Sequence, residues 1–397
     1  MKSRAIRLLY AYAFLDDFIF IYPLYQLMFV ARGLSINQIS WLFIIWSVAA
    51  LATEVPTGLL ADRYSRTKLL AIGQLIKAAG FLVWLIWPTF WGFALGFVLW
   101  GIGSSFDSGT FQALMYDELE ALGQHENYVR IRGRSESWRL TGNLMGTASA
   151  SLIVGFGFNT VLTLSLFAPL AAALIAWNIP QAPRREEPSD TAEISTRQAI
   201  SETFRKPAVL LIVLLGGFIG AMFGSLEEYT AIFFKTVGAP LTAIPILEAI
   251  LVLATVLASV VAHRFEALST RTFIYILALS GVCLAGSTSP GGAGAVGLMI
   301  AFFFVTKLLE VIYDGKLQHS ITGKLRATIT SVSGFAMEIL SIGTYLVFGA
   351  VADTRGTMAA FTVFGITIIV VAAGYFAFGR RLFTDRAPSP AGRGARG

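Results

Sequence analysis

The 397-residue chain has few charged residues and almost no cysteine. Only 14% of its residues are Asp, Glu, Lys or Arg, 55% are hydrophobic, and the mean hydropathy is +0.69. A soluble domain carries about a quarter charged residues, so this composition excludes that class. The single cysteine, Cys283, excludes an internal disulfide. The three histidines, His125, His263 and His319, lie in expected loops without a ligand cluster. We therefore expect no metal, no cofactor and no enzyme active site.

Long apolar runs take the place of the missing charge. An α-helix needs about 20 residues to cross the roughly 30 Å hydrocarbon core of a bilayer. The first run is not a cleaved signal sequence, because it contains Asp16 and Asp17 and no small-residue cleavage site follows it. The sequence therefore predicts an all-α integral membrane protein with twelve transmembrane helices. The runs cover about 8–30, 38–60, 69–88, 90–114, 137–157, 160–179, 207–235, 241–262, 272–288, 294–313, 327–350 and 357–379.

Positive residues alternate between the expected loops. With the amino terminus in the cytoplasm, the segments on that side hold 25 of the 30 lysines and arginines, including all four in 130–139. This positive-inside bias predicts a multi-pass protein of the plasma (inner) membrane with both termini cytoplasmic. The same bias explains the basic pI of 9.4, so we expect the lipid bilayer, and no nucleic acid, as a partner.

One long polar stretch divides the runs into six plus six. We predict an N-terminal six-helix bundle (1–180), a cytoplasmic linker (181–206), a C-terminal six-helix bundle (207–380) and a disordered cytoplasmic tail (381–397). Tyr116-Asp117 and Tyr313-Asp314 end corresponding helices of the two parts. Similar residue pairs at the ends of corresponding helices predict two pseudo-symmetric halves, as secondary transporters often have.

A short polar loop joins the second and third runs and reads Gly58-Leu59-Leu60-Ala61-Asp62-Arg63-Tyr64-Ser65-Arg66-Thr67-Lys68. It resembles the signature of the major facilitator superfamily, roughly Gly-x-Leu-Ala-Asp-Arg-x-Gly-Arg-Arg/Lys, although serine stands at 65 where the family usually has glycine. The resemblance covers about residues 8–380. It implies a bacterial transporter, similar to drug and small-molecule efflux members, whose two halves rock about a central cavity.

The resemblance also implies a gating role for this loop. Its residues would latch the halves in one state, with Asp117 and the start of helix eleven near Arg326 as partners; the gating residues are thus Gly58, Asp62, Arg63, Arg66, Asp117 and Arg326. The alternative is that Gly58 and Asp62 only terminate and cap helices.

Two other patterns of the family fit poorly. Phe97 stands where proton-coupled members often carry arginine, four residues before Gly101, and no proline accompanies Gly142 and Gly146 in helix five. The Gly142-x-x-x-Gly146 spacing instead predicts close helix packing.

Acidic residues inside the runs are the candidate site. An ionised side chain at mid-bilayer costs roughly 2.5–3.5 kcal/mol, so these acids must face protein or water, pair, or carry protons. The resemblance implies that helices one, four, seven and ten line the cavity. We predict a substrate and proton cavity formed by Asp16, Asp17, Asp107, Glu227, Glu228 and Glu338; the alternative is structural pairing, with Lys77 as a partner in the N-terminal half. Lys307 and Glu310, three residues apart, are expected to pair. The predicted membrane helices contain nine acids in all, the six cavity residues together with Glu54, Glu248 and Glu310. Only two lysines, Lys77 and Lys307, lie in these helices and could balance their charge.

The function expected from these features is secondary active transport of a small organic molecule. Proton-coupled export by alternating access is favoured; an uptake symporter or facilitator, and a receptor or sensor with a transporter fold, are alternatives. The uncompensated acids and the Phe- and Trp-rich helices favour cationic, zwitterionic or lipophilic cargo. Protons are the expected second partner, with Asp16 or Asp17 as the coupling acid, and we expect a monomer.

Overall fold

The computed structural model describes residues 2–180, 207–265, 267–289, 291–320 and 326–378. The predicted linker 181–206 and tail 381–397 lie outside these residues. All regular structure in the described ranges is helical. The α-helices are α1 (Lys2–Asp17), α2 (Tyr25–Ala31), α3 (Ile36–Arg63), α4 (Arg66–Ile86), α5 (Phe90–Asp107), α6 (Thr110–Ala121), α7 (Tyr128–Ile153), α8 (Phe158–Ser165), α9 (Phe167–Trp177), α11 (Pro207–Glu227), α12 (Thr230–Thr236), α13 (Ile244–Val261), α14 (Thr270–Gly286), α15 (Ala293–Ser320), α16 (Arg326–Arg355) and α17 (Thr357–Phe378).

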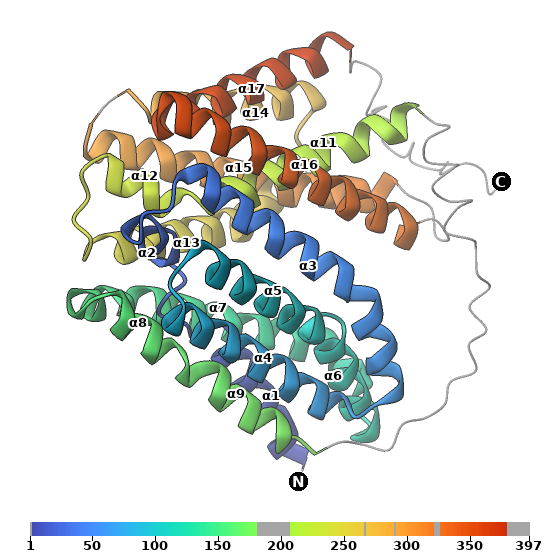
Figure 1. Ribbon diagram of the computed structural model, residues 1–397. Helices are drawn as coiled ribbons and strands as arrows, with labels where there is room; N and C mark the ends of the chain where they lie inside the picture. The colour runs from blue at the N-terminus through green and yellow to red at the C-terminus, as the bar shows by residue number, and fades with distance from the viewer. Residues whose placement is uncertain (1, 181–206, 266, 290, 321–325, 379–397) are drawn as a thin grey trace, which may run out of the picture.

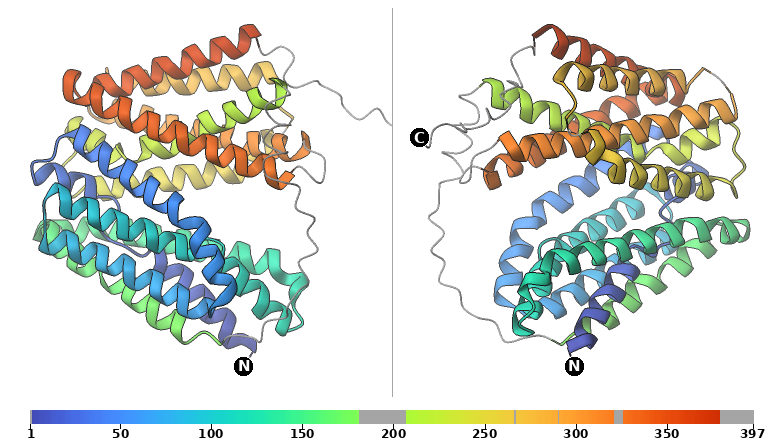
Figure 2. Two further views of the ribbon diagram at one scale, coloured as in Figure 1. Left: turned by 45° about the vertical axis from the view of Figure 1, so that its right-hand side comes forward. Right: turned by 180° about the vertical axis from the view of Figure 1, so that it is seen from behind.

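The helices form two bundles, α1–α9 and α11–α17, which lie one above the other in Figure 1 and in both views of Figure 2. Helix α3 of the first bundle packs against α16 of the second, and α7 packs against α13. We call the face at which α1 begins and α17 ends the termini face, and the other the opposite face. The two bundles are the halves predicted from the sequence.

Helices in series account for the crossings of the membrane. Seven described segments are long and apolar enough to cross a bilayer by length and composition. With α1–α2, α5–α6, α8–α9 and α11–α12 each taken as one crossing, the described helices form the twelve-helix architecture predicted from the sequence, which confirms the fold class. Four of the twelve predicted spans, 8–30, 90–114, 160–179 and 207–235, are each interrupted by a break between two helices.

Glycines bring α4 and α5 into close contact. A Cβ atom added to Gly80 would lie 2.7 Å from the carbonyl oxygen of Gly96, and one added to Gly103 would lie 2.8 Å from that of Gly73. Only glycine allows the two backbones to approach this closely. Lys77 lies between these contacts on α4 and is buried.

A second glycine pair brings α7 against α1. A Cβ atom on Gly142 would collide with the backbone of Phe14, and one on Gly146 would lie 2.8 Å from the amide nitrogen of Ile19. The predicted role of this glycine spacing in helix packing is therefore confirmed. The contact places Arg139, one turn before Gly142 on α7, beside the end of α1.

The signature loop is a very short connection. Helix α3 ends at Arg63 and α4 begins at Arg66, and the Ser65 hydroxyl accepts a hydrogen bond from the Lys68 amide at 3.4 Å. Ser65 is therefore the N-cap of α4. Asp62 lies in the last turn of α3, and a capping role for its carboxylate stays a prediction.

Candidate functional site

Four crossings consist of two helices in series, and in three of them an acidic residue ends the first helix. Helix α1 ends at Asp17, α5 ends at Asp107 and α11 ends at Glu227. The last carbonyl groups of a helix have no partner within it and give its end a partial negative charge. Each acid therefore lies where a negative charge is poorly tolerated, and donors or cations must compensate it.

Two cations compensate the acids of the N-terminal half. The Lys77 Nζ atom lies 3.0 Å from Asp16 Oδ1 and donates to the Asp16 carbonyl oxygen at 2.8 Å. Arg139 pairs with Asp16, and its Nη2 atom lies 3.2 Å from Asp107 Oδ2. The prediction that no side chain neutralises the membrane acids is thus wrong for Asp16 and Asp107. The alternative, a structural pair of Asp16 with Lys77, is confirmed.

Neutral donors complete this charged cluster. Gln74 Nε2 donates to Asp16 Oδ1 at 2.6 Å and to the Tyr12 hydroxyl at 3.1 Å, while that hydroxyl donates to Asp107 Oδ1 at 2.8 Å. Each carboxylate oxygen of Asp16 and Asp107 thereby receives at least one donor. A small cavity of about 190 Å³ lies beside the cluster.

A larger central cavity of about 340 Å³ lies between the halves, and the small cavity shares Asp17, Tyr22 and Trp100 with it. No lysine or arginine is among the described residues that line it. The lining acids are Asp17, Glu227, Glu228 and Glu248, and the lining aromatic residues are Tyr22, Tyr25, Phe43, Trp46, Phe97 and Trp100. The predicted cavity residues Asp17, Glu227 and Glu228 therefore do lie together, joined by Glu248 from α13, which the prediction had left out.

The aromatic residues form a stacked wall in this cavity. Trp100 stacks on Tyr22 with ring centroids 5.2 Å apart and on Phe97 with centroids 5.7 Å apart. Flat, parallel rings of this kind present π faces that attract cations and planar apolar groups.

Two of the four acids of the central cavity, Glu228 and Glu248, form hydrogen bonds with hydroxyl groups. Tyr25, from the N-terminal half, donates to Glu228 of the other half. The Thr230 hydroxyl lies 2.7 Å from Glu248 Oε1 and 2.7 Å from the Glu227 carbonyl oxygen. Gln26 also lines the cavity, and its buried Oε1 atom has no hydrogen-bond partner among the described residues.

The halves are joined at the opposite face. Asp353, near the end of α16, accepts a hydrogen bond from the Ser35 hydroxyl at 2.8 Å and one from the Asn37 amide at 3.2 Å. These groups belong to the first turn of α3, where a negative charge is favourable. Deeper in the bundle, Ser40 and Tyr229 share a hydrogen bond of 2.6 Å between their hydroxyls.

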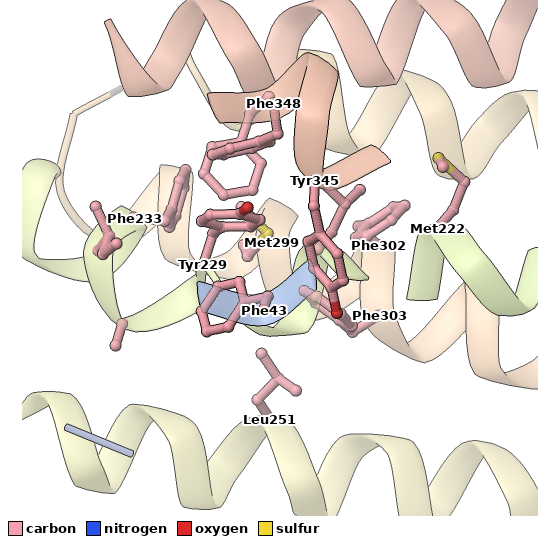
Figure 3. Close-up of a cluster of buried hydrophobic side chains, with 14 of the residues drawn as sticks. Phe43, Met222, Tyr229, Phe233, Leu251, Met299, Phe302, Phe303, Tyr345 and Phe348 are labelled. Carbon is pink, nitrogen blue, oxygen red and sulfur yellow. The ribbon is translucent and has the colours of Figure 1, made fainter. Parts of the chain in front are cut away.

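Aromatic packing adds to this closure. Phe43 of α3 inserts among side chains of the C-terminal half, with ring centroids 5.5 Å from Tyr229 and 5.3 Å from Tyr345, as Figure 3 shows. Tyr229 stacks on Phe348 with centroids 3.8 Å apart. All four rings are buried. The central cavity is therefore separated from the opposite face by a packed aromatic layer.

The gating residues gather at the termini face only in part. Arg66 pairs with Asp117 and donates to the Ala113 carbonyl oxygen at 3.1 Å, which ties α4 to α6 within one half. Gly58, Asp62 and Arg63 lie in the exposed end of α3, and Arg326 is the first residue of α16, its side chain outside the described part. A latch between the halves at this face stays a prediction.

Glu338 and Glu310 lie apart from the acids of the central cavity. Glu338, on α16, is half-buried and lines neither of the two cavities described above. Glu310 pairs with Lys307 at 3.0 Å, which confirms the pairing predicted from their spacing. Helix α15 thus contributes no acid to the central cavity, and α13 supplies Glu248 instead.

Broken membrane-length helices in two bundles, with a polar cavity between the bundles, define a secondary transporter. The chain belongs to the Major Facilitator Superfamily, whose family model matches residues 7–337. It is therefore a multi-pass membrane protein, and it is a transporter of small molecules rather than an enzyme.

Similar proteins support this assignment. An MFS-type transporter of Bacillus subtilis (strain 168), YxaM, is 20% identical over 364 residues, which cover 88% of this chain and 89% of the relative. The solved nucleoside transporter NupG aligns with a TM-score of 0.76 at 15% identity, over 96% of this chain and 99% of NupG. A D-xylose–proton symporter aligns with a TM-score of 0.68 at 13% identity, over 95% and 97% of the two chains. These two structures show the fold alone.

Proposed function

We propose that the protein exports small organic cations or zwitterions with aromatic or lipophilic parts, in exchange for protons. The central cavity supports this proposal, because its described lining contains four acids and six aromatic rings and no lysine or arginine. Carboxylates and ring faces both attract a cation. A multiply charged anion would meet repulsion from every ionised group in the cavity.

The contacts between the halves support alternating access. Because the opposite face is closed by Asp353 and by the aromatic layer around Phe43, we infer that the described state exchanges cargo with the termini face. The positive-inside bias makes that face cytoplasmic. Cargo would enter from the cytoplasm, and proton binding and release would bias the equilibrium between the two states. One chain encloses the whole cavity, so we propose a functional monomer.

The alternative function is uptake. One structural neighbour is named as a D-xylose–proton symporter, and the same cavity could move cargo inward with a proton or without one. A receptor or sensor would bind cargo without moving it. Flux measurements separate these functions, since counterflow requires transport and a pH-driven gradient requires coupling.

A binding experiment tests the cavity directly. Trp100 lies in the cavity wall, whereas Trp91, near the start of α5, is exposed. Ethidium should quench tryptophan fluorescence of the purified protein, and an aromatic carboxylate of similar size should not. Trp100→Phe should lower the quenching, and Trp91→Phe should leave it unchanged. Preferred binding of the carboxylate would contradict the proposed cargo class.

A transport experiment then tests direction. Proteoliposomes with a more acidic interior should accumulate ethidium through those molecules whose termini face points outward, and a protonophore should abolish the accumulation. Accumulation driven by the reverse pH gradient would favour uptake by symport, and counterflow without any pH effect would favour a facilitator.

A further inference from the structure

The hydroxyl of Thr230 lies between two acceptor oxygens. Its Oγ1 atom is 2.7 Å from the Glu227 carbonyl oxygen and 2.7 Å from Glu248 Oε1. A threonine hydroxyl carries one proton, and neither a carbonyl nor an ionised carboxylate can donate. Two hydrogen bonds of this length therefore need a second proton. The Glu248 carboxyl group is the one place where it can reside.

The surroundings of Glu248 supply no cation. Glu227 and Glu228, at the end of α11, act on it electrostatically, and Asp17 of α1 shares the cavity. From α7, the neutral Asn143 and Thr147 face the same cavity. Glu248 itself is only 9% exposed. Among the described residues, every charged group that shares the cavity with Glu248 is acidic, so an ionised carboxylate here would lack a direct cation partner.

The charged groups of two further neighbouring helices do not compensate it. Lys307, on α15, is paired with Glu310 at 3.0 Å. Lys235, in the last turn of α12, is exposed.

A second acceptor in the same cavity is also without a donor. Gln26 is 5% exposed, and its Oε1 atom has no partner among the described residues. Gln26 lies in the first turn of α2 and lines the cavity there, whereas Glu248 lies on α13. The cavity thus has an excess of acceptors, which a proton or an N–H donor would satisfy.

The broken helix of the N-terminal half shows the same arrangement with a cation in place. There the Lys77 ammonium donates both to the Asp16 carbonyl oxygen, near the end of α1, and to the Asp16 carboxylate. At the end of α11 the carbonyl of Glu227 and the carboxyl of Glu248 share the Thr230 hydroxyl, and no lysine or arginine is among the described residues of the cavity. We propose that Glu248 is the proton-binding residue of this transporter, and that a proton at this residue takes the part that Lys77 plays in the other half.

This inference rests on the proposed proton coupling and adds the site where it occurs. In the described state the Glu248 carboxyl group is protonated and donates a hydrogen bond to the Thr230 hydroxyl. When the proton leaves to water, the carboxylate adds a negative charge to the cavity, which strengthens the attraction of a cationic cargo. Proton and cargo thus compete for one group, and competition of this kind makes their transport opposite in direction.

Infrared difference spectroscopy of the purified protein tests the proton directly, without any cargo. The wild type at neutral pH should show the C=O stretching band of a protonated carboxyl group, and the band should shift in D2O. Glu248→Gln should remove this component, and the control Glu310→Gln should keep it. An unchanged band in the Glu248→Gln protein would overturn the proposal.

A second variant covers the case in which Glu248→Gln does not fold. Thr230→Val keeps the carboxyl group but removes its hydrogen-bond partner, so the band should remain and change frequency. A band that keeps its frequency would equally overturn the assignment to Glu248.

Transport measurements separate this inference from the proposed function. Glutamine can donate to Thr230 as a protonated carboxyl group does, but it cannot release a proton, so Glu248→Gln should lose the ethidium accumulation that a pH gradient drives. Accumulation at the wild-type level would overturn the role of Glu248 in coupling. If the wild type itself moved no ethidium, the proposed function would fail, whereas the infrared result would still decide where the proton resides.

Discussion

The buried pair of Lys77 and Asp16 allows a quantitative test of the charged cluster. The two charged atoms are 3.0 Å apart, and the side chains are only 7% and 5% exposed. Removal of one partner leaves the other charge buried, which typically costs about 3–5 kcal/mol. Lys77→Met should therefore lower the free energy of unfolding by about this amount. Asp16→Asn should cost less, because Lys77 keeps its bond to the Asp16 carbonyl oxygen.

The double variant measures the interaction itself. With both charges removed, the loss of stability should fall short of the sum of the single losses by about 2 kcal/mol, within the range for contacting residues. The assay is equilibrium unfolding in mixed micelles, in which the fraction of denaturing detergent is raised and helix content is followed by circular dichroism.

The chain offers a matched control pair. Lys307 and Glu310 lie at the same distance of 3.0 Å, but their side chains are 27% and 34% exposed. A pair of this kind on one helix contributes about 0.5 kcal/mol or less. Equal coupling energies for the two pairs would contradict the argument that burial strengthens the interaction of Lys77 with Asp16. The same holds if the stability losses of Asp16→Asn and Lys77→Met were additive within about 0.5 kcal/mol.

Three further predictions concern single sites. Asp62→Asn should keep membrane expression but lower transport strongly, because loss of the charge shifts the balance between the inward-open and outward-open states. If the variant transported as well as the wild type, Asp62 would have a structural role only. Phe43→Ala, which removes a buried ring worth about 3–5 kcal/mol, should open the opposite face and speed labelling of a cysteine at Thr147 by an impermeant maleimide added outside cells. Asp17→Asn should weaken ethidium binding roughly tenfold, as loss of a charged contact of about 1.5 kcal/mol implies, whereas Asp16→Asn should mainly reduce stability; the reverse pattern would exchange their roles.

The fold was predictable because membrane helices are long and apolar, but the breaks in them were predictable only in part. The first break contains Pro23, and the break after Asp107 contains Gly109 with a φ of +73°. Both residue types are local signals of a helix end. The break at Glu228 and Tyr229 contains neither. It depends on contacts with the other half, such as that of Tyr229 with Ser40, which no local pattern reveals.

Arg139 was the main residue that the sequence interpretation misplaced. It follows Arg130, Arg132 and Arg134 closely and was therefore assigned to a cytoplasmic segment, yet all four lie in α7, which begins at Tyr128. Eleven residues of helix carry Arg139 roughly 16 Å inward. A usable signal was present, because Gly142 and Gly146 stand three and seven residues further on and share its helix face.

The two halves compensate their acids in different ways, and this difference bears on where coupling can occur. In the N-terminal half, Asp16 and Asp107 are neutralised by Lys77 and Arg139, which are part of the chain and cannot leave. A charge balance of that kind stays the same throughout a transport cycle, so it can stabilise the structure but cannot report on a passing ion. In the C-terminal half, Glu228 and Glu248 bind the hydroxyl groups of Tyr25 and Thr230, and no lysine or arginine is among the described residues that line the cavity. A proton or a cationic cargo that enters the central cavity can add to their compensation and to that of Asp17 from α1. Binding there can therefore change the energy difference between two conformations.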